Sequence, residues 1–127
     1  MATRPSFTSG DIFTAVNANI LATSIVALNT QSGTAYTAAL TDVGKLISFT
    51  SSSSIVFTLP ANATVAFAVG DQINIYQAGT ATATITPAAT VTVRSSGSKL
   101  KTNDQFSVAT CIKIDTNEWI ALGNLKS

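Results

Sequence analysis

From Gln31 to the C-terminus, apolar residues alternate with threonine, serine and other small polar residues in short runs. Gln72–Tyr76 and Gln105–Ile114 show this alternation most clearly. Successive side chains of a β-strand point to opposite faces of a sheet, so the pattern predicts strands with one buried face. Gly, Pro, Asn and Asp separate the runs, and this spacing predicts about seven to nine strands. The expected strands are 36–40, 45–49, 54–59, 72–76, 82–86, 90–94, 99–101, 105–114 and 119–122.

No long helical pattern interrupts these runs, and this argues against the βαβ units that build parallel sheets. We therefore expect a mainly β fold, an antiparallel β-sandwich of jelly-roll-like arrangement, with a short N-terminal arm or helix. The chain has 127 residues, which suits one ordinary domain. The pattern changes near Thr30, so residues 1–30 form the expected arm and short helix, and residues 31–127 form the expected sandwich.

The segment Ala15–Asn29 has apolar residues at helical spacing behind Thr14, a suitable N-cap. Its polar face carries no charge, so the helix should form only when it packs on something; an extended arm is the alternative. Ahead of it, 1–13 is irregular and carries large apolar residues. We expect the arm to dock onto a partner, whereas the alternative is a disordered terminus. The expected docking residues are Arg4, Phe7, Ile12, Phe13, Ile20 and Leu21.

Charged residues are scarce: they make up 10% of the chain, against roughly 25% in typical soluble proteins. Threonine, serine, alanine and asparagine take their place, and such a surface costs little to desolvate against a neighbour. We interpret it as the surface of an assembly subunit; a soluble extracellular protein with a Thr/Ser surface is the alternative. The net charge of +1 predicts no nucleic-acid or membrane partner.

The residues needed for most catalytic sites are missing. There is no histidine, and Cys111 is the single cysteine, so Ser-His-Asp and Cys-His sites cannot form. The six acids are scattered, and most fall in expected turns. Asp104 with Glu118 is the one pair considered for glycoside hydrolysis. The chain is therefore expected to be non-enzymatic, with no catalytic residues, cofactor or metal.

Three weaker candidates have simpler structural explanations. The segment Asp115–Glu118 could contact a calcium ion, but a hairpin turn is favoured. Arg94, Lys99 and Lys101 could bind a polyanion, but no aromatic residues are interleaved with them, and a solvated loop is favoured. Trp119 could face a sugar, but a lone tryptophan in a terminal strand is usually a core residue.

Two parts of the sequence resemble proteins of tailed bacteriophages. The segment 4–19 resembles the opening of many phage structural proteins, which begin with a basic residue followed by an F-x-x-G-x-x-x-T-A pattern and an asparagine. The remainder looks like a β-domain that recurs in phage tail-fibre, head-fibre and capsid decoration proteins. The segments that carry this second resemblance are 36–45, 54–60, 67–73, 109–114 and 119–125.

The resemblance implies a virion structural protein that is assembled in the host cytoplasm; no signal peptide opens the sequence. One arm and one domain suit a capsid cement or decoration protein that binds the major capsid protein and links capsomers. A homotrimer is expected, because it fits the local threefold points of a shell. The alternative is a tail-fibre or head-fibre component that binds a host surface glycan through Tyr76 or Trp119.

Overall fold

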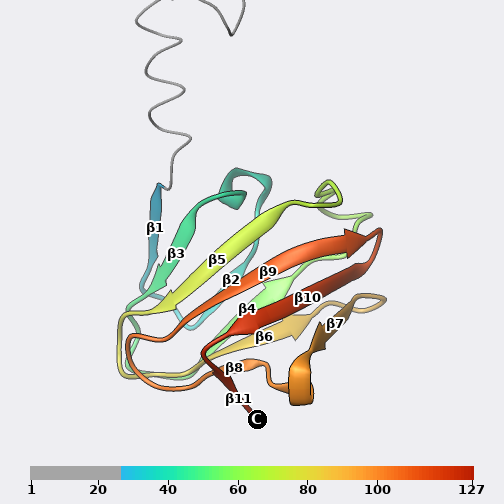
Figure 1. Cartoon of the computed structure of the whole chain (residues 1–127). Coiled ribbons are helices and arrows are strands. Elements are labelled where there is room, and N and C mark those ends of the chain that lie inside the picture. The colour runs from blue at the N-terminus through green and yellow to red at the C-terminus, as the bar shows by residue number, and fades with distance from the viewer. Residues whose placement is uncertain (1–26) are drawn as a thin grey trace, which may run out of the picture.

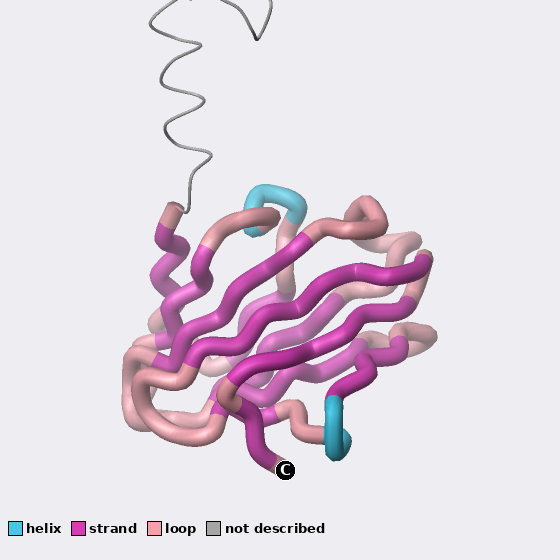
Figure 2. The backbone as a smooth tube through the Cα atoms, viewed as in Figure 1, coloured by secondary structure: helices cyan, strands magenta, loops and turns pink. Residues whose placement is uncertain are grey.

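The computed structural model describes residues 27–127, and these form two facing β-sheets (Figure 1). Sheet A has six strands in the order β1-β3-β5-β9-β10-β7, and sheet B has five in the order β11-β8-β6-β4-β2. Apart from two 3-10 turns, the regular structure is all strand (Figure 2), which confirms a mainly β, sandwich-like fold. The strands are β1 Leu28–Gln31, β2 Ala35–Thr37, β3 Leu46–Phe49, β4 Ile55–Leu59, β5 Gln72–Gln77, β6 Ala83–Pro87, β7 Thr92–Ser95, β8 Lys101–Thr102, β9 Val108–Asp115, β10 Glu118–Gly123 and β11 Leu125–Lys126.

The chain passes from one sheet to the other at every connection from β1 to β9. As a result β1, β3 and β5 lie side by side and parallel in sheet A, and β2, β4 and β6 do the same in sheet B. These six strands form a flattened coil of three turns. The hairpin of β9 and β10 lies between β5 and β7 in sheet A. Its strand β9 pairs antiparallel with β5, and its strand β10 pairs parallel with β7.

The prediction of antiparallel pairing is wrong for much of the sandwich. Five of the strand pairs are parallel and four are antiparallel, so a jelly roll, which is antiparallel, is not confirmed. Alternation reports which side chains are buried, not the direction of the neighbouring strand. Parallel strands here need no helical crossover, because each connection runs over to the opposite sheet and back.

The core lies between the two sheets and is filled by alternate residues of each strand. In sheet A, Ile47 of β3 is in register with Ile75 of β5, and both are fully buried. In sheet B, Phe57 of β4 is in register with Ile85 of β6, and the Phe57 ring meets Phe49 of sheet A edge-on at 5.8 Å. Each such side chain contributes about 1.5–3 kcal/mol when it is fully buried. The alternation in β5 predicts its buried residues Ile73 and Ile75 correctly. In β9 the more apolar residues, Val108, Ile112 and Ile114, lie on the outer side, and the smaller Ala109 and Cys111 are buried together with Lys113.

The first turn of the coil closes its end of the core with a polar network. Asn29 of β1 donates to an oxygen of Asp42 at 2.8 Å and to the Tyr36 hydroxyl at 3.0 Å. Tyr36 donates to the other Asp42 oxygen at 2.6 Å, and Gln31 donates to Asn29 at 2.8 Å. Asp42 is buried, and its hydrogen bonds satisfy the carboxylate there.

The predicted C-terminal end of the helix, at Asn29, is wrong. Residues 28 and 29 lie in β1, paired in parallel with β3, and Asn29 points into the polar network and does not end a helix. The domain boundary expected near Thr30 falls inside this strand. The rest of the expected helix, residues 15–26, lies outside the described residues.

Replacing Gly79 by alanine should destabilise the fold, because the corners of the coil are stacked closely at this glycine. A Cβ there would lie 2.5 Å from the backbone oxygens of Thr50 and Ser51, and backbone cannot move aside cheaply. We expect Gly79→Ala to lower the free energy of unfolding by about 2–3 kcal/mol in urea titrations. Gly33→Ala is the matched control, since nothing lies within 4 Å of its Cβ position. Equal stability of the two variants would contradict this packing.

Candidate interaction surface

The outer side of sheet A carries an unusual number of exposed apolar side chains. Leu28 is 64% exposed, Leu122 49% and Val108 42%, and half-buried aliphatic residues lie between them. Exposed apolar side chains that gather on one side of a protein often mark a contact surface. We call this surface the apolar face; its apolar members are Leu28, Leu46, Tyr76, Val108, Ile112, Ile114, Ile120 and Leu122.

A polar strip of Gln72, Asn74 and Thr110 separates two groups of aliphatic side chains on the apolar face. Leu28 and Leu46 lie on β1 and β3, and most of the others lie on β9 and β10. Tyr76 lies on β5 beside the strip, in a row with the polar Thr30 and Ser48. A row of paired residues crosses five strands, from Leu28 through Leu46, Asn74 and Thr110 to Leu122. The row therefore begins and ends on an exposed leucine and is polar in its centre.

The polar side chains of the strip are already hydrogen-bonded to one another. Gln72 and Thr110 both donate to the Asn74 side-chain oxygen, at 3.0 and 2.8 Å. The Asn74 amide donates at 3.4 Å to the backbone oxygen of Lys45. Covering these groups costs little, because a polar group that keeps its partner does not pay the penalty of an unsatisfied one.

Charge is almost absent from this side of the sandwich. Among residues 27–127, the outward positions of β1, β3 and β5 carry no charged side chain within the strands' paired rows. Exposed Asp115 ends β9 beside Glu118 of β10, which forms an ion pair with Arg94 of β7 at this margin. A partner that covers the row from Leu28 to Leu122 therefore desolvates no charge.

The outer side of sheet B has the opposite character. Threonines occupy its strands, and Lys101 and Lys126 stand at one end of the row that starts at Ala35. A depression of about 380 Å³ lies between these lysines and nearby serine and threonine residues. Val56, 45% exposed, is the main aliphatic residue on this side. The asymmetry makes the apolar face the candidate surface for a protein contact.

The three basic residues expected to cluster are separated by the fold. Arg94 lies on sheet A and pairs with Glu118, whereas Lys101 lies on sheet B beside Lys126. Lys99 follows the 3-10 turn Ser96–Ser98, which joins the two sheets. Residues a few positions apart in the chain thus point to opposite sides of the sandwich, and no common anion site results.

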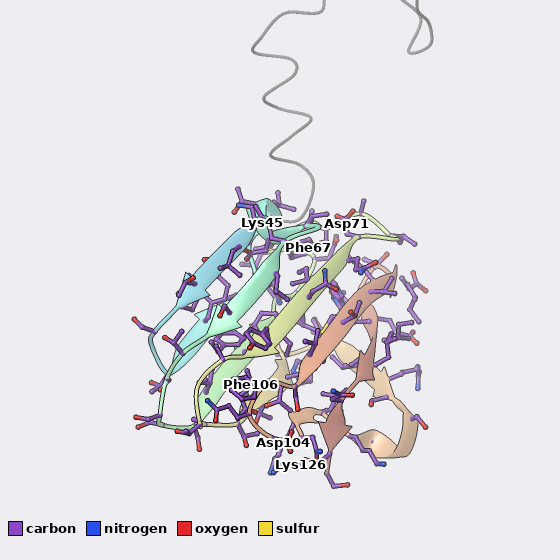
Figure 3. All side chains as sticks on the ribbon, turned by 60° about the vertical axis from the view of Figure 1, so that its left-hand side comes forward. Lys45, Phe67, Asp71, Asp104, Phe106 and Lys126 are labelled. Atoms are coloured by element: carbon purple, nitrogen blue, oxygen red, sulfur yellow. The ribbon has the colours of Figure 1, made fainter. Side chains whose placement is uncertain are left out.

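The acid pair considered for glycoside hydrolysis is also separated. Asp104 lies in the loop before β9, while Glu118 begins β10 at the far end of the same hairpin. The eight residues of β9 hold the two ends roughly 24 Å apart, beyond the spacing of a glycosidase pair. In Figure 3, Asp104 lies at the opposite end of the sandwich from Asp71. The backbone oxygen of Asp71 accepts a hydrogen bond from the backbone of Lys113, near the end of β9 that adjoins Glu118.

The possible calcium ligands at the β9–β10 turn have other partners. Asn117 accepts a hydrogen bond from the backbone of Asn62 at 2.9 Å, and Asp115 accepts one from Thr116. Glu118 is paired with Arg94. Over residues 27–127, no group of three or more Cys, Asp or Glu side chains is arranged to hold a metal ion. The turn therefore ties the hairpin to a neighbouring loop.

Asp42 is buried and in contact with the half-buried Tyr36, and the geometry of this pair is structural. Burial, followed by the hydrogen bond to Asp42, raises the pKa of Tyr36 above its ordinary value. Both Asp42 oxygens are occupied by Asn29, Tyr36 and the backbone N–H of Ala39. Neither group is free to transfer a proton to a ligand.

The aromatic residues divide between the core and the surface. Trp119 is buried and meets the Phe67 ring edge-on at 5.3 Å, so it cannot stack on a sugar. Tyr76 lies half-buried on the apolar face. Phe106 is 64% exposed in the loop before β9, in a left-handed conformation with φ of 75°. The expected strand 105–114 includes Phe106, but in the structure this residue stands in a loop (Figure 3).

The residues expected to dock the arm, from Arg4 to Leu21, lie outside the described part of the chain. Within residues 27–127, no helix has the length and apolar character to cross a membrane. Comparisons with protein-family models, curated proteins and solved structures give no match.

The thiol of Cys111 should be inert in the folded protein. Burial raises its pKa from 9.0 to about 12, which leaves roughly a thousandth of the usual thiolate. We expect an aromatic disulfide reagent at about pH 8 to label Cys111 only after denaturant unfolds the chain. Because the folded-state pKa is raised, the associated stability is complete below the unfolded value and is lost as the pH rises toward the folded one. Rapid labelling of the native protein would contradict this burial.

Proposed function

We propose that the chain is a non-enzymatic structural protein of a phage virion, a capsid cement or decoration protein that strengthens contacts between capsomers. The apolar face is the observation that carries this proposal. Such a surface suits a permanent neighbour, because covering it removes aliphatic area from water at little cost in desolvated charge. In solution at high concentration the same surface would favour aggregation.

The proposal divides the work between the two parts of the chain. The segment ahead of β1 supplies the arm that docks on the major capsid protein, through Arg4, Phe7, Ile12, Phe13, Ile20 and Leu21. The β-domain contacts further subunits of the assembly, including other copies in a homotrimer. Many weak contacts of this kind add up over a shell. The site of action is the virion, and neither nucleic acid nor membrane is a partner.

The described surface supports a structural role better than a catalytic one. Asp104 and Glu118 stand far apart, and the carboxylate of Asp42 is fully occupied by hydrogen bonds. The side chains that remain exposed on the apolar face are aliphatic and have no acid–base chemistry.

A fibre component that binds a host surface glycan is the second candidate, and Phe106 favours it. This exposed ring is held outward by a loop whose backbone is tied to Gln77 by a 2.7 Å hydrogen bond. Exposed aromatic rings are suited to stacking on apolar sugar faces. Glycan-array binding that is lost in Phe106→Ala would favour the fibre, whereas its absence would favour cement.

A charge placed on the apolar face should stop incorporation into particles. Val108 and Val56 are 42% and 45% exposed on opposite outer faces, so they form a matched pair. We expect Val108→Lys to reduce the copies per purified particle at least tenfold, which is about 1.4 kcal/mol, because the interface would bury an unpaired charge. Val56→Lys should be incorporated normally. Both variants should keep unfolding free energies within about 1 kcal/mol of the parent.

Quantitative mass spectrometry of purified particles measures the copies, and labelling shows where they lie. Copies spread over the whole head would support a cement protein, and copies confined to one vertex would contradict it. Equal incorporation of the two lysine variants would show that the apolar face is not the assembly surface.

A further inference from the structure

We infer that the outer side of sheet B binds an acidic saccharide in the depression between Lys101 and Lys126. The inference goes beyond the proposed function. It does not depend on what covers the apolar face, because the depression lies on the opposite sheet. Phe106, the aromatic residue considered for glycan stacking, does not line the depression. Three observations support the site: the pairing of the two lysines, the side chains around them and the volume that they enclose.

The two lysines stand directly opposite each other on neighbouring strands. Lys101 of β8 is paired with Lys126 of β11, and side chains paired in this way have Cβ atoms about 4.5–5.5 Å apart. Both lysines point outward, because their neighbours in the strands, Thr102 and Leu125, face the core. Like charges in directly opposite positions repel each other and destabilise a sheet. An anion bound between the ammonium groups would replace this repulsion with attraction.

No acidic side chain of sheet B neutralises the pair. The five strands of this sheet contain neither Asp nor Glu. Within residues 27–127, the one ion pair joins Arg94 and Glu118, on sheet A. Asp104, two residues beyond β8, accepts a hydrogen bond from the Ser107 hydroxyl at 3.1 Å. The chain has seven basic residues, and two of them therefore stand together where their own sheet supplies no counter-charge.

The walls of the depression carry hydroxyl groups. Ser54, Thr82, Thr84 and Ser127 surround the two lysines, and among residues 27–127 no aliphatic or aromatic side chain lines it. Hydroxyl groups both donate and accept hydrogen bonds, so they suit the hydroxyl groups of a sugar. Without an aromatic ring the depression has nothing on which a nucleobase could stack, and without aliphatic walls it gives an acyl chain no shelter from water.

The size of the depression suits a small ligand. Its volume is about 380 Å³, within the range of roughly 300–1,000 Å³ that is usual for small-molecule sites. The row Thr84–Lys101–Lys126 crosses three neighbouring strands, so the ammonium groups lie to one side and the threonine hydroxyls to the other. An acidic saccharide can therefore place its carboxylate or sulfate between the lysines while its hydroxyl groups meet Thr82 and Thr84.

Titrations of the full-length chain with trisaccharides test the site. The probes are a galacturonic acid trisaccharide, its uncharged methyl ester and a sulfated galactose trisaccharide, and backbone amide NMR shifts report binding. We expect an acidic probe to shift the resonances around Thr84 in a saturable way. It should bind about tenfold or more tightly than the methyl ester, because charge-assisted hydrogen bonds are roughly twice as strong as neutral ones. The acidic probe that binds more tightly identifies the charged group.

Two double variants with the same loss of charge separate this site from general charge attraction. Lys101→Gln, Lys126→Gln removes both lysines of the depression. Lys45→Gln, Lys99→Gln removes two lysines that do not line it, and Lys45 lies at the opposite end of the sandwich from Lys126 (Figure 3). We expect the first variant to weaken binding of the acidic trisaccharide about tenfold or more, and the second to change it by about twofold or less, because distant exposed charges are screened.

Each outcome decides the inference. Failure of the parent chain to bind either acidic probe overturns it. Equal weakening in the two double variants also overturns it, because the attraction then comes from the overall charge. A hexaglutamate peptide that binds as tightly as the better trisaccharide overturns the saccharide class, since the ligand is then an acidic polypeptide. Removing the opposed lysines should not lower the thermal unfolding midpoint, because they repel each other in the parent.

Discussion

The packing of sheet A against sheet B governs the rest of the structure, because it fixes which residues face outward. Ile47, Ile75 and Phe57 are fully buried between the sheets, and a shift of one residue in any of their strands would expose them. Once the inward residues are set, every alternate residue belongs to an outer face. The chain can then vary that face for contacts without changing the core.

Buried polar contacts hold the parts of the chain that alternation does not specify. Lys113, inward on β9, donates to Asn62 at 2.7 Å and to the backbone of Phe67 at 2.8 Å, and so ties the long loop between β4 and β5 to sheet A. Thr102 of sheet B donates to Gln77 of sheet A at 2.5 Å and joins the two sheets inside the core. Threonine-rich strands are weakly specific in register, and satisfied buried groups such as these favour one arrangement over its neighbours.

The sequence predicts the positions of most strands, but it predicts their connectivity poorly. The alternation in β5 identifies its inward residues, because the period of two is a local property. In β9 the same pattern misleads, because the aliphatic Val108, Ile112 and Ile114 lie on the outer side and Lys113 lies inward. Strand direction depends on where each connection leads, and no residue in a run such as Gln72–Gln77 records whether its neighbour is parallel. The expected strand 105–114 begins at Val108 instead, since Phe106 adopts a left-handed conformation. Arg94 and Lys101 are close in sequence, but the crossing between sheets separates them, so the expected basic cluster does not form.

The apolar face emerges only when the strand order is known. Leu28 and Leu122 are far apart in the sequence, and only the order β1-β3-β5-β9-β10 places them at the two ends of one row. The low charge of the whole chain predicts a surface suited to being covered, but it does not say which surface. The lysines at positions 101 and 126 stand on the other sheet, where they keep that side hydrated. The charges of sheet A, in contrast, gather at the end of the β9–β10 hairpin around Arg94 and Glu118, away from Leu28.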